Sequence, residues 1–165
     1  MSDQLSIFAA NYLWYVIIGI AVVYFLWQPW PEKIHLVVFA ALVLLLVYPV
    51  SLLASALYYD PRPFVVGHFT PLIPHKPSNG FPSDHVLWSA AIAAIIFPSN
   101  RWLSAVLWVL VIAVGASRVY VGVHHVTDIV GSMTIAAGVA ALVYYALRKL
   151  NMIISSRKNF PPRSH

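Results

Sequence analysis

The chain has no cysteine and very little charge. Among its 165 residues the absence of cysteine excludes a disulfide, a thiolate nucleophile and a cysteine-ligated metal. Charged residues make up 9% and hydrophobic residues 61%, whereas a soluble domain has about 25% charged residues and is roughly half apolar. Mean hydropathy is +0.79. The composition predicts an integral membrane protein, and the length fits one domain over residues 1–165.

The few basic residues are unevenly distributed along the chain. The formal net charge is +5, and five basic side chains lie in the last eighteen residues: Arg148, Lys149, Arg157, Lys158 and Arg163. By the positive-inside rule, this predicts a cytoplasmic C-terminus facing lipid headgroups, and it argues against a nucleic-acid-binding arm. We expect residues 158–165 to form a flexible basic tail. Because residues 1–6 lack the basic flank of a cleavable signal peptide, we expect the first apolar segment to stay in the protein.

Five apolar segments approach or exceed the roughly 20 residues that a membrane-spanning helix needs. They cover residues 7–27, 33–57, 83–97, 102–121 and 128–147. The second contains Pro49, which predicts a kink, and the short third one has Ser83 as its expected N-cap. A long proline-rich loop, residues 58–82, precedes the third, and its aromatic residues argue against disorder. The sequence therefore predicts an all-α polytopic membrane helical bundle of about five transmembrane helices with a long outer loop.

Five crossings from a cytoplasmic C-terminus place the N-terminus outside. Lys33 and Arg101 then fall in cytoplasmic turns, whereas the proline-rich loop and residues 122–127 face the outer side. Polar residues gather in three stretches on that outer side, namely Asp60-Pro61-Arg62-Pro63, Phe81-Pro82-Ser83-Asp84-His85, and Ser117-Arg118 followed by His124 and Asp128. We expect these stretches to form one site.

His124 and Asp128 have the spacing of a catalytic pair. Four residues separate them, so on a helix both project from one face. A carboxylate that accepts a proton from one ring nitrogen fixes the tautomer and leaves the other nitrogen free to attack. The structural alternative is that Asp128 only caps the fifth helix. The role of the adjacent His125 stays open.

The other polar residues are suited to binding an anion. His85, at the start of the third helix, could act as a general acid, and the free backbone N–H groups after Ser83 favour an anion. Asp84 is favourable at a helix N-terminus without any catalytic role. Arg62 and Arg118 carry planar donor forks suited to phosphate oxygens. Because Arg118 ends an apolar helix, we expect it to have an anionic partner, either a carboxylate or a bound anion.

Metal and haem sites are the alternatives for the histidines. His85, His124, His125 and Asp128 could bind zinc, but no HExxH-type spacing is present and two arginines would repel a cation. A haem held by two histidines would need His35 and His85 to face each other, and our topology puts them at opposite faces. We therefore expect no metal and no cofactor. No catalytic role is assigned to the remaining candidates, His35, His68, His75 and Lys76.

In order and spacing, the three stretches resemble the signature of the type 2 phosphatidic acid phosphatase superfamily. That signature reads Lys-x6-Arg-Pro, then Pro-Ser-Gly-His, then Ser-Arg-x5-His-x3-Asp. The third segment is matched in full by Ser117, Arg118, His124 and Asp128. The second is matched by Pro82, Ser83 and His85, with Asp84 in place of the glycine. The first keeps Arg62 and Pro63, but Ser55 stands at the lysine position.

Where the chain departs from the signature, its residues resemble those of one bacterial branch of that superfamily. Asp-Pro-Arg-Pro-Phe-Val, Leu-Ile-Pro-His and Phe-Pro-Ser-Asp-His look like the undecaprenyl-pyrophosphate phosphatases of the bacitracin-resistance type. That branch also has an aspartate after the serine and tends to lack the lysine. The missing lysine leaves one phosphate contact unassigned, and Lys76 is a candidate to supply it.

The resemblance implies a metal-free hydrolase at the outer face of a bacterial cell membrane. His124 would attack the terminal phosphorus, Asp128 would orient it, and His85 would protonate the leaving phosphate. The phosphoryl oxygens would be held by the other motif residues: Arg62, Pro82, Ser83, Ser117 and Arg118. The implied substrate is a polyprenyl diphosphate lipid, undecaprenyl pyrophosphate, whose product serves cell-wall polymer synthesis. No nucleic acid and no obligate protein partner are expected.

Two alternatives to this function stay open. The first keeps the chemistry and changes the lipid to phosphatidylglycerophosphate, phosphatidate or another prenyl diphosphate. The second is a non-enzymatic protein that binds or transports an anionic lipid. Tail selectivity depends on the shape of a groove, which the sequence does not give.

Overall fold

The structure, a computed structural model, describes residues 2–150. It contains the helices α1 (Asp3–Trp27), α2 (Trp30–Leu57), α3 (Pro63–Val66), α4 (Asp84–Ile96), α5 (Arg101–Tyr120) and α6 (Val126–Lys149). Within these residues the only β pairing is an isolated bridge between Pro61 and Asn79. The all-α prediction is confirmed, and the short helix α3 inside the proline-rich loop was not expected. The basic tail expected at 158–165 lies outside the described residues.

A short helix at the centre of the bundle organises the other four. α1, α2, α5 and α6 are each long and apolar enough to cross a membrane. α4 has 13 residues, which at 1.5 Å per residue spans about 20 Å, less than the ~30 Å of a hydrocarbon core. It packs against all four long helices, and eight of its residues are buried. The third predicted span is thus an enclosed apolar helix rather than one that faces lipid along its length.

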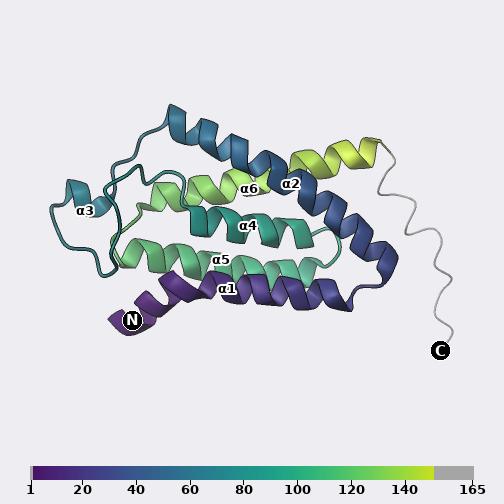
Figure 1. The fold of residues 1–165 in the computed structure, drawn as a ribbon, viewed down its shortest axis with the longest axis horizontal. Coiled ribbons are helices and arrows are strands. Elements are labelled where there is room, and N and C mark those ends of the chain that lie inside the picture. Colours follow the sequence, from purple (N-terminus) through teal and green to yellow (C-terminus); the bar gives the residue numbers. More distant parts are fainter. Residues whose placement is uncertain (1, 151–165) are drawn as a thin grey trace.

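The chain ends mark the two ends of the bundle. Figure 1 places the N-terminus, α3 and the proline-rich loop at one end, and the last turn of α6 at the other. α1 and α2 are joined by a short turn at the α6 end and diverge toward the loop end (Figure 1). The polar stretches of the sequence therefore meet at the loop end. Ser83 occupies the N-cap position of α4 as expected, although its side chain makes no capping hydrogen bond.

Glycines allow two close approaches around α6. A Cβ at Gly115 on α5 would collide with the Ile129 side chain on α6, and a Cβ at Gly131 would collide with the Phe81 ring. Gly138, further along α6, has nothing within 4 Å of an added Cβ. The contact of Phe81 with α6 fixes the loop immediately before α4.

We predict that Gly115→Ala destabilises the bundle and that Gly138→Ala does not. The added methyl at Gly115 meets Ile129, and overpacking of this kind typically costs about 1–3 kcal/mol. At Gly138 the methyl enters open space, and alanine is the better helix former. Thermal unfolding of the two variants in the same detergent checks this. Equal melting temperatures would contradict the close α5–α6 contact.

Candidate active site

The polar stretches of the sequence meet in one pocket of about 250 Å³ at the loop end of the bundle. Its lining includes five of the predicted site residues: Arg62, Pro82, His85, Arg118 and His124. Asp84 also lines it, whereas Ser83 and Asp128 are fully buried and stand outside the lining. Ser117 points away, because its hydroxyl donates to Val114 O of its own helix over 2.6 Å.

The pair of His124 and Asp128 is formed and buried. His124 Nδ1 lies 3.1 Å from Asp128 Oδ2, and the side chains are 3% and 0% exposed. The same Oδ2 accepts the backbone N–H of His125 over 2.9 Å, at the N-cap of α6. Asp128 therefore contacts the first turn of the helix and the His124 ring at once, so it does more than cap the helix. His124 Nε2 is left on the pocket side, 3.3 Å from Nη1 of Arg62.

Arg62 is anchored by backbone carbonyls rather than by a carboxylate. Nη1 donates to Val123 O over 2.9 Å and Nη2 donates to Asn79 O over 3.2 Å. The residue is 6% exposed, and its Nε is buried without a hydrogen-bond partner. Burial lowers the pKa of Arg62, and the charge of Asp128 partly offsets that effect.

Arg118 is buried at the end of α5 and lines the pocket. It is 3% exposed, its Nη1 donates to Ala10 O over 3.4 Å, and its Nε is buried without a partner. Among residues 2–150, no carboxylate forms an ion pair with Arg118 or Arg62. Of the two partners considered from sequence, the carboxylate is therefore not found in the described part of the chain. Two buried cations face the same small pocket.

His85 is positioned by α1. Its ring meets the Trp14 ring edge-on, with centroids 5.2 Å apart, and Trp14 Nε1 is tied to Asn11 O over 3.1 Å. The sequence gave no reason to connect α1 with the site, because Trp14 fits an interfacial aromatic belt equally well. The structure gives it a second role as the neighbour that supports the His85 ring.

His75 is a pocket residue that sequence reasoning missed. Its ring stands edge-on to His124 with centroids 6.2 Å apart, and its Nδ1 is buried without a partner. Burial lowers the pKa of His75 to about 4, with smaller contributions from Arg62 and Arg118. The neighbouring Lys76, suggested as a substitute for the family lysine, is exposed and is not among the pocket-lining residues. The Pro-His dipeptide was the only available signal for His75.

Asn79 ties the loop to α2 and was also missed. Its Oδ1 accepts the backbone N–H groups of Asp60 and Phe81 over 2.9 and 3.0 Å. Its Nδ2 lies 3.1 Å from both Ser55 O and Ser55 Oγ. Ser55, at the family's lysine position, therefore helps to hold the loop instead of presenting a cation to the pocket.

A possible metal cluster lies beside the pocket. Asp60, His125 and Asp128 bring one ligand atom each to within 4.8 Å of one another. Hydrogen bonding accounts for only part of these groups: Asp128 Oδ2 takes two donors and Asp60 Oδ2 accepts the Thr127 hydroxyl over 3.0 Å, whereas Asp128 Oδ1 and His125 Nδ1 are buried without a hydrogen-bond partner. His125 Nδ1 also lies 3.1 Å from Asp60 Oδ1. These contacts connect the proline-rich loop to the start of α6.

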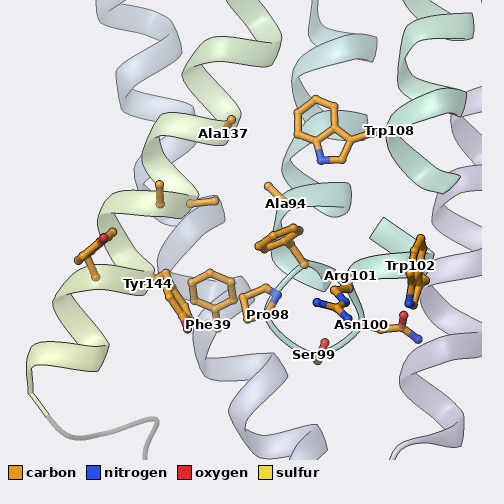
Figure 2. Close-up of a pocket in the computed structure, with 14 residues that line it drawn as sticks. Phe39, Ala94, Pro98, Ser99, Asn100, Arg101, Trp102, Trp108, Ala137 and Tyr144 are labelled. Carbon is orange, nitrogen blue, oxygen red and sulfur yellow. The ribbon is translucent and has the colours of Figure 1, made fainter. Parts of the chain in front are cut away.

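A larger cavity, about 1010 Å³, lies at the other end of the bundle by the α4–α5 turn. Figure 2 shows Phe39, Trp108 and Tyr144 around it, with Arg101 at the turn. Among residues 2–150, Arg101 and two tyrosines are the ionisable side chains that line it, with no histidine or carboxylate. It therefore lacks the combination of histidines and arginines that lines the pocket at the loop end. His35 hydrogen-bonds Pro31 O at the start of α2, at this same end, so it does not face His85.

Residues 33–152 match the PAP2 superfamily, and the chain belongs to it. One relative is the undecaprenyl-diphosphatase BcrC of Bacillus subtilis (strain 168), 34% identical over 95 residues, which are 58% of this chain and 49% of that protein. Another is the putative undecaprenyl-diphosphatase YbjG of Escherichia coli (strain K12), 34% identical over 132 residues, 79% of this chain and 66% of that protein. The chain thus matches about half the length of the Bacillus relative.

The fold resembles that of a solved structure. The crystal structure of Aquifex aeolicus LpxE superposes with a TM-score of 0.71 over 88% of each chain, at 18% sequence identity. At that identity the likeness concerns the fold alone. With four helices long and apolar enough to cross a membrane among residues 2–150, the chain is a multi-pass membrane protein.

We predict that Asn79→Ala lowers both the stability and the activity of each folded molecule. The substitution leaves backbone N–H groups of Asp60 and Phe81 without their acceptor, at a cost of about 1–3 kcal/mol. Asn100→Ala is the matched control, because Asn100 caps α5 at the far end by accepting from Leu103 N. Melting temperature should fall in both variants, but specific activity only in Asn79→Ala. Equal activities would contradict the anchoring role.

We also predict that stability falls as the pH drops below about 6.5. The folded state keeps the pKa of His75 at about 4, whereas the unfolded chain takes up that proton near the ordinary value of 6.5. Because the unfolded state binds more protons in that window, acid favours unfolding. His124, whose pKa is also lowered, mainly by burial, adds in the same direction. Melting temperatures from pH 7.5 to 4.5 check this, and His75→Gln should flatten the curve where His68→Asn leaves it unchanged.

Proposed function

We propose that this protein is a membrane lipid pyrophosphatase that removes the terminal phosphate of undecaprenyl pyrophosphate and leaves undecaprenyl phosphate. One observation carries the proposal: two buried guanidinium groups without carboxylate partners share a 250 Å³ pocket with His85 and His124. Buried charges need a compensating partner, and a diphosphate supplies the charge and the acceptor oxygens. The two undecaprenyl-diphosphatase relatives support this choice of lipid.

The proposed reaction begins at His124. Nδ1–H donates to Asp128, so Nε2 carries the lone pair and faces the pocket. Nε2 attacks the terminal phosphorus, the bond from that phosphorus to the bridging oxygen breaks, and undecaprenyl phosphate leaves with a proton from His85. Asp128 stabilises the positive charge that His124 acquires. The product of this step is a phosphohistidine.

Water completes the proposed cycle. Neutral His85 now takes a proton from water, whose oxygen attacks the phosphorus, and the N–P bond breaks to release inorganic phosphate. Arg62 and Arg118 hold the equatorial oxygens through both steps, and charge stabilisation is the main catalytic contribution. Nη1 of Arg62 already lies 3.3 Å from Nε2, which places this donor beside the reacting bond. Ser83, whose Oγ is buried without a partner, lies behind this pocket and supports the motif around His85.

We infer that the pocket faces the outside of the cell. Lys33, Arg101 and the pair Arg148 and Lys149 belong to turns or helix ends at the end opposite the pocket. The positive-inside rule assigns that end to the cytoplasm. The diphosphate would then be cleaved at the outer surface, in a bacterial cell membrane.

Two alternative functions can be distinguished from the proposed one by experiment. A phosphatase for phosphatidylglycerophosphate, phosphatidate or a shorter prenyl diphosphate would use the same pocket. Side-by-side phosphate release from these lipids separates it from the proposed one. An anionic-lipid binding or transport protein would need the arginines but not a nucleophile.

We predict that His124→Ala lowers phosphate release from undecaprenyl pyrophosphate by at least about a thousandfold, the scale of loss seen when a nucleophile is removed. The fold should persist, because the melting temperature reports packing rather than nucleophilicity. His68→Asn, which changes an exposed loop histidine, should keep full activity.

Two results would count against this prediction. If His124→Ala keeps turnover, the phosphohistidine route is wrong. If wild-type activity vanishes with a chelator and returns with zinc, the metal-free mechanism is wrong.

A further inference from the structure

An apolar groove lies beside α2, and on that helix its lining residue Leu44 stands one turn from the pocket-lining Tyr48. The groove has a volume of about 270 Å³, and all the residues that line it are apolar. Six of the eight α2 residues that line the groove or the pocket lie at intervals of three or four and share one helical face: Val37, Ala40, Leu44, Tyr48, Ser51 and Ser55. The other two, Leu36 and Leu52, each stand next to a member of this face. Along the face, the groove-lining residues are apolar and the pocket-lining residues carry hydroxyl groups.

α4 repeats this arrangement on the opposite wall. His85 lines the pocket, and Ile92 and Ile95 line the groove. Trp88 lies between them at the same helical spacing and stacks on Tyr48 of α2, with ring centroids 6.4 Å apart and planes 18° from parallel. The stacked pair therefore stands where the pocket passes into the groove.

α1 forms the remaining wall of the groove through Ile18, Ala21, Val22 and Phe25. α4 packs against both α1 and α2, which diverge toward the pocket end (Figure 1). At the far end, Lys33 Nζ sits 5.7 Å from the centre of the Phe25 ring. The groove thus runs from about one helical turn beyond the pocket to a cation by the α1–α2 turn.

We propose that this groove binds the isoprenoid tail of the lipid substrate. The tail would run past the Tyr48–Trp88 pair on its way from the pocket to the groove. The inference rests on the proposed function, because it takes the diphosphate to lie in the pocket. Residues 37–55 span about 27 Å of helix axis, nearly the ~30 Å of a hydrocarbon core, so a tail along this face of α2 crosses most of the apolar layer. The 1010 Å³ cavity offers a less direct path, since Phe39 is the one α2 residue that lines it.

The test fills the groove and measures chain-length preference. In Leu44→Trp, an indole occupies the groove one turn beyond Tyr48. The measured quantity is the ratio of kcat/KM for the eleven-unit prenyl diphosphate to that for the one-unit diphosphate, dimethylallyl diphosphate. We expect this ratio to fall by about tenfold, the effect of ~1.4 kcal/mol of lost contact. Leu45→Trp is the control, because Leu45 is 70% exposed and does not line the groove.

A second variant measures how far the tail reaches. Ala40→Trp blocks the groove one turn further on, so the shortest chain that it impairs should be longer than the shortest chain impaired by Leu44→Trp. If Leu44→Trp leaves the ratio unchanged, or if Leu45→Trp lowers it equally, the groove does not bind the tail and holds membrane lipid or a second copy of the chain instead. If wild-type protein releases phosphate from neither diphosphate, the proposed function fails, and this result is distinct from the first two.

Discussion

The site depends on the electrostatic demand of two buried arginines. A buried guanidinium without an ion-pair partner is costly, and among residues 2–150 two such groups, Arg62 and Arg118, line one pocket. Carbonyls of Val123, Asn79 and Ala10 satisfy part of their hydrogen bonding but none of their charge. The two buried positive charges therefore destabilise the folded protein, and a bound phosphate group offsets this cost. Affinity for an anion follows from this arrangement before any catalytic step is considered.

The nucleophile pair and the loop are parts of one hydrogen-bonded unit. Asp128 contacts His124, and Asp60 on the loop contacts Thr127 and lies beside His125. Gly80 makes this possible, since a Cβ there would come within 2.9 Å of Asp128 Oδ2 and 3.1 Å of Asp60 O. The loop that carries Arg62 thus rests directly on the carboxylate that orients the histidine.

The sequence predicted those parts of the structure that repeat or have fixed spacing. The apolar runs gave the four long helices to within four residues at their starts and two at their ends, because lipid imposes length and composition on a spanning helix. The spacing of His124 and Asp128 predicted their contact, since an α-helix brings residues four apart together. The family resemblance predicted that Arg62, His85 and Arg118 belong to one site, and in the structure all three line the same pocket.

The missed features depend on long-range contacts. His75 and Asn79 sit in a loop without periodicity, so nothing local indicated that one would reach His124 and the other Ser55. Trp14 contacts His85 across 71 positions of sequence. The short length of α4 was visible, but its enclosure by four longer helices was not, because a buried helix and a spanning helix share the same apolar composition.

The shared carboxylate of Asp128 has a consequence for the order in which the structure forms. One oxygen both accepts from the first turn of α6 and contacts the ring of His124. A chain whose last helix is unformed has neither contact. The position of the imidazole therefore depends on completion of the final helix, and the two form together.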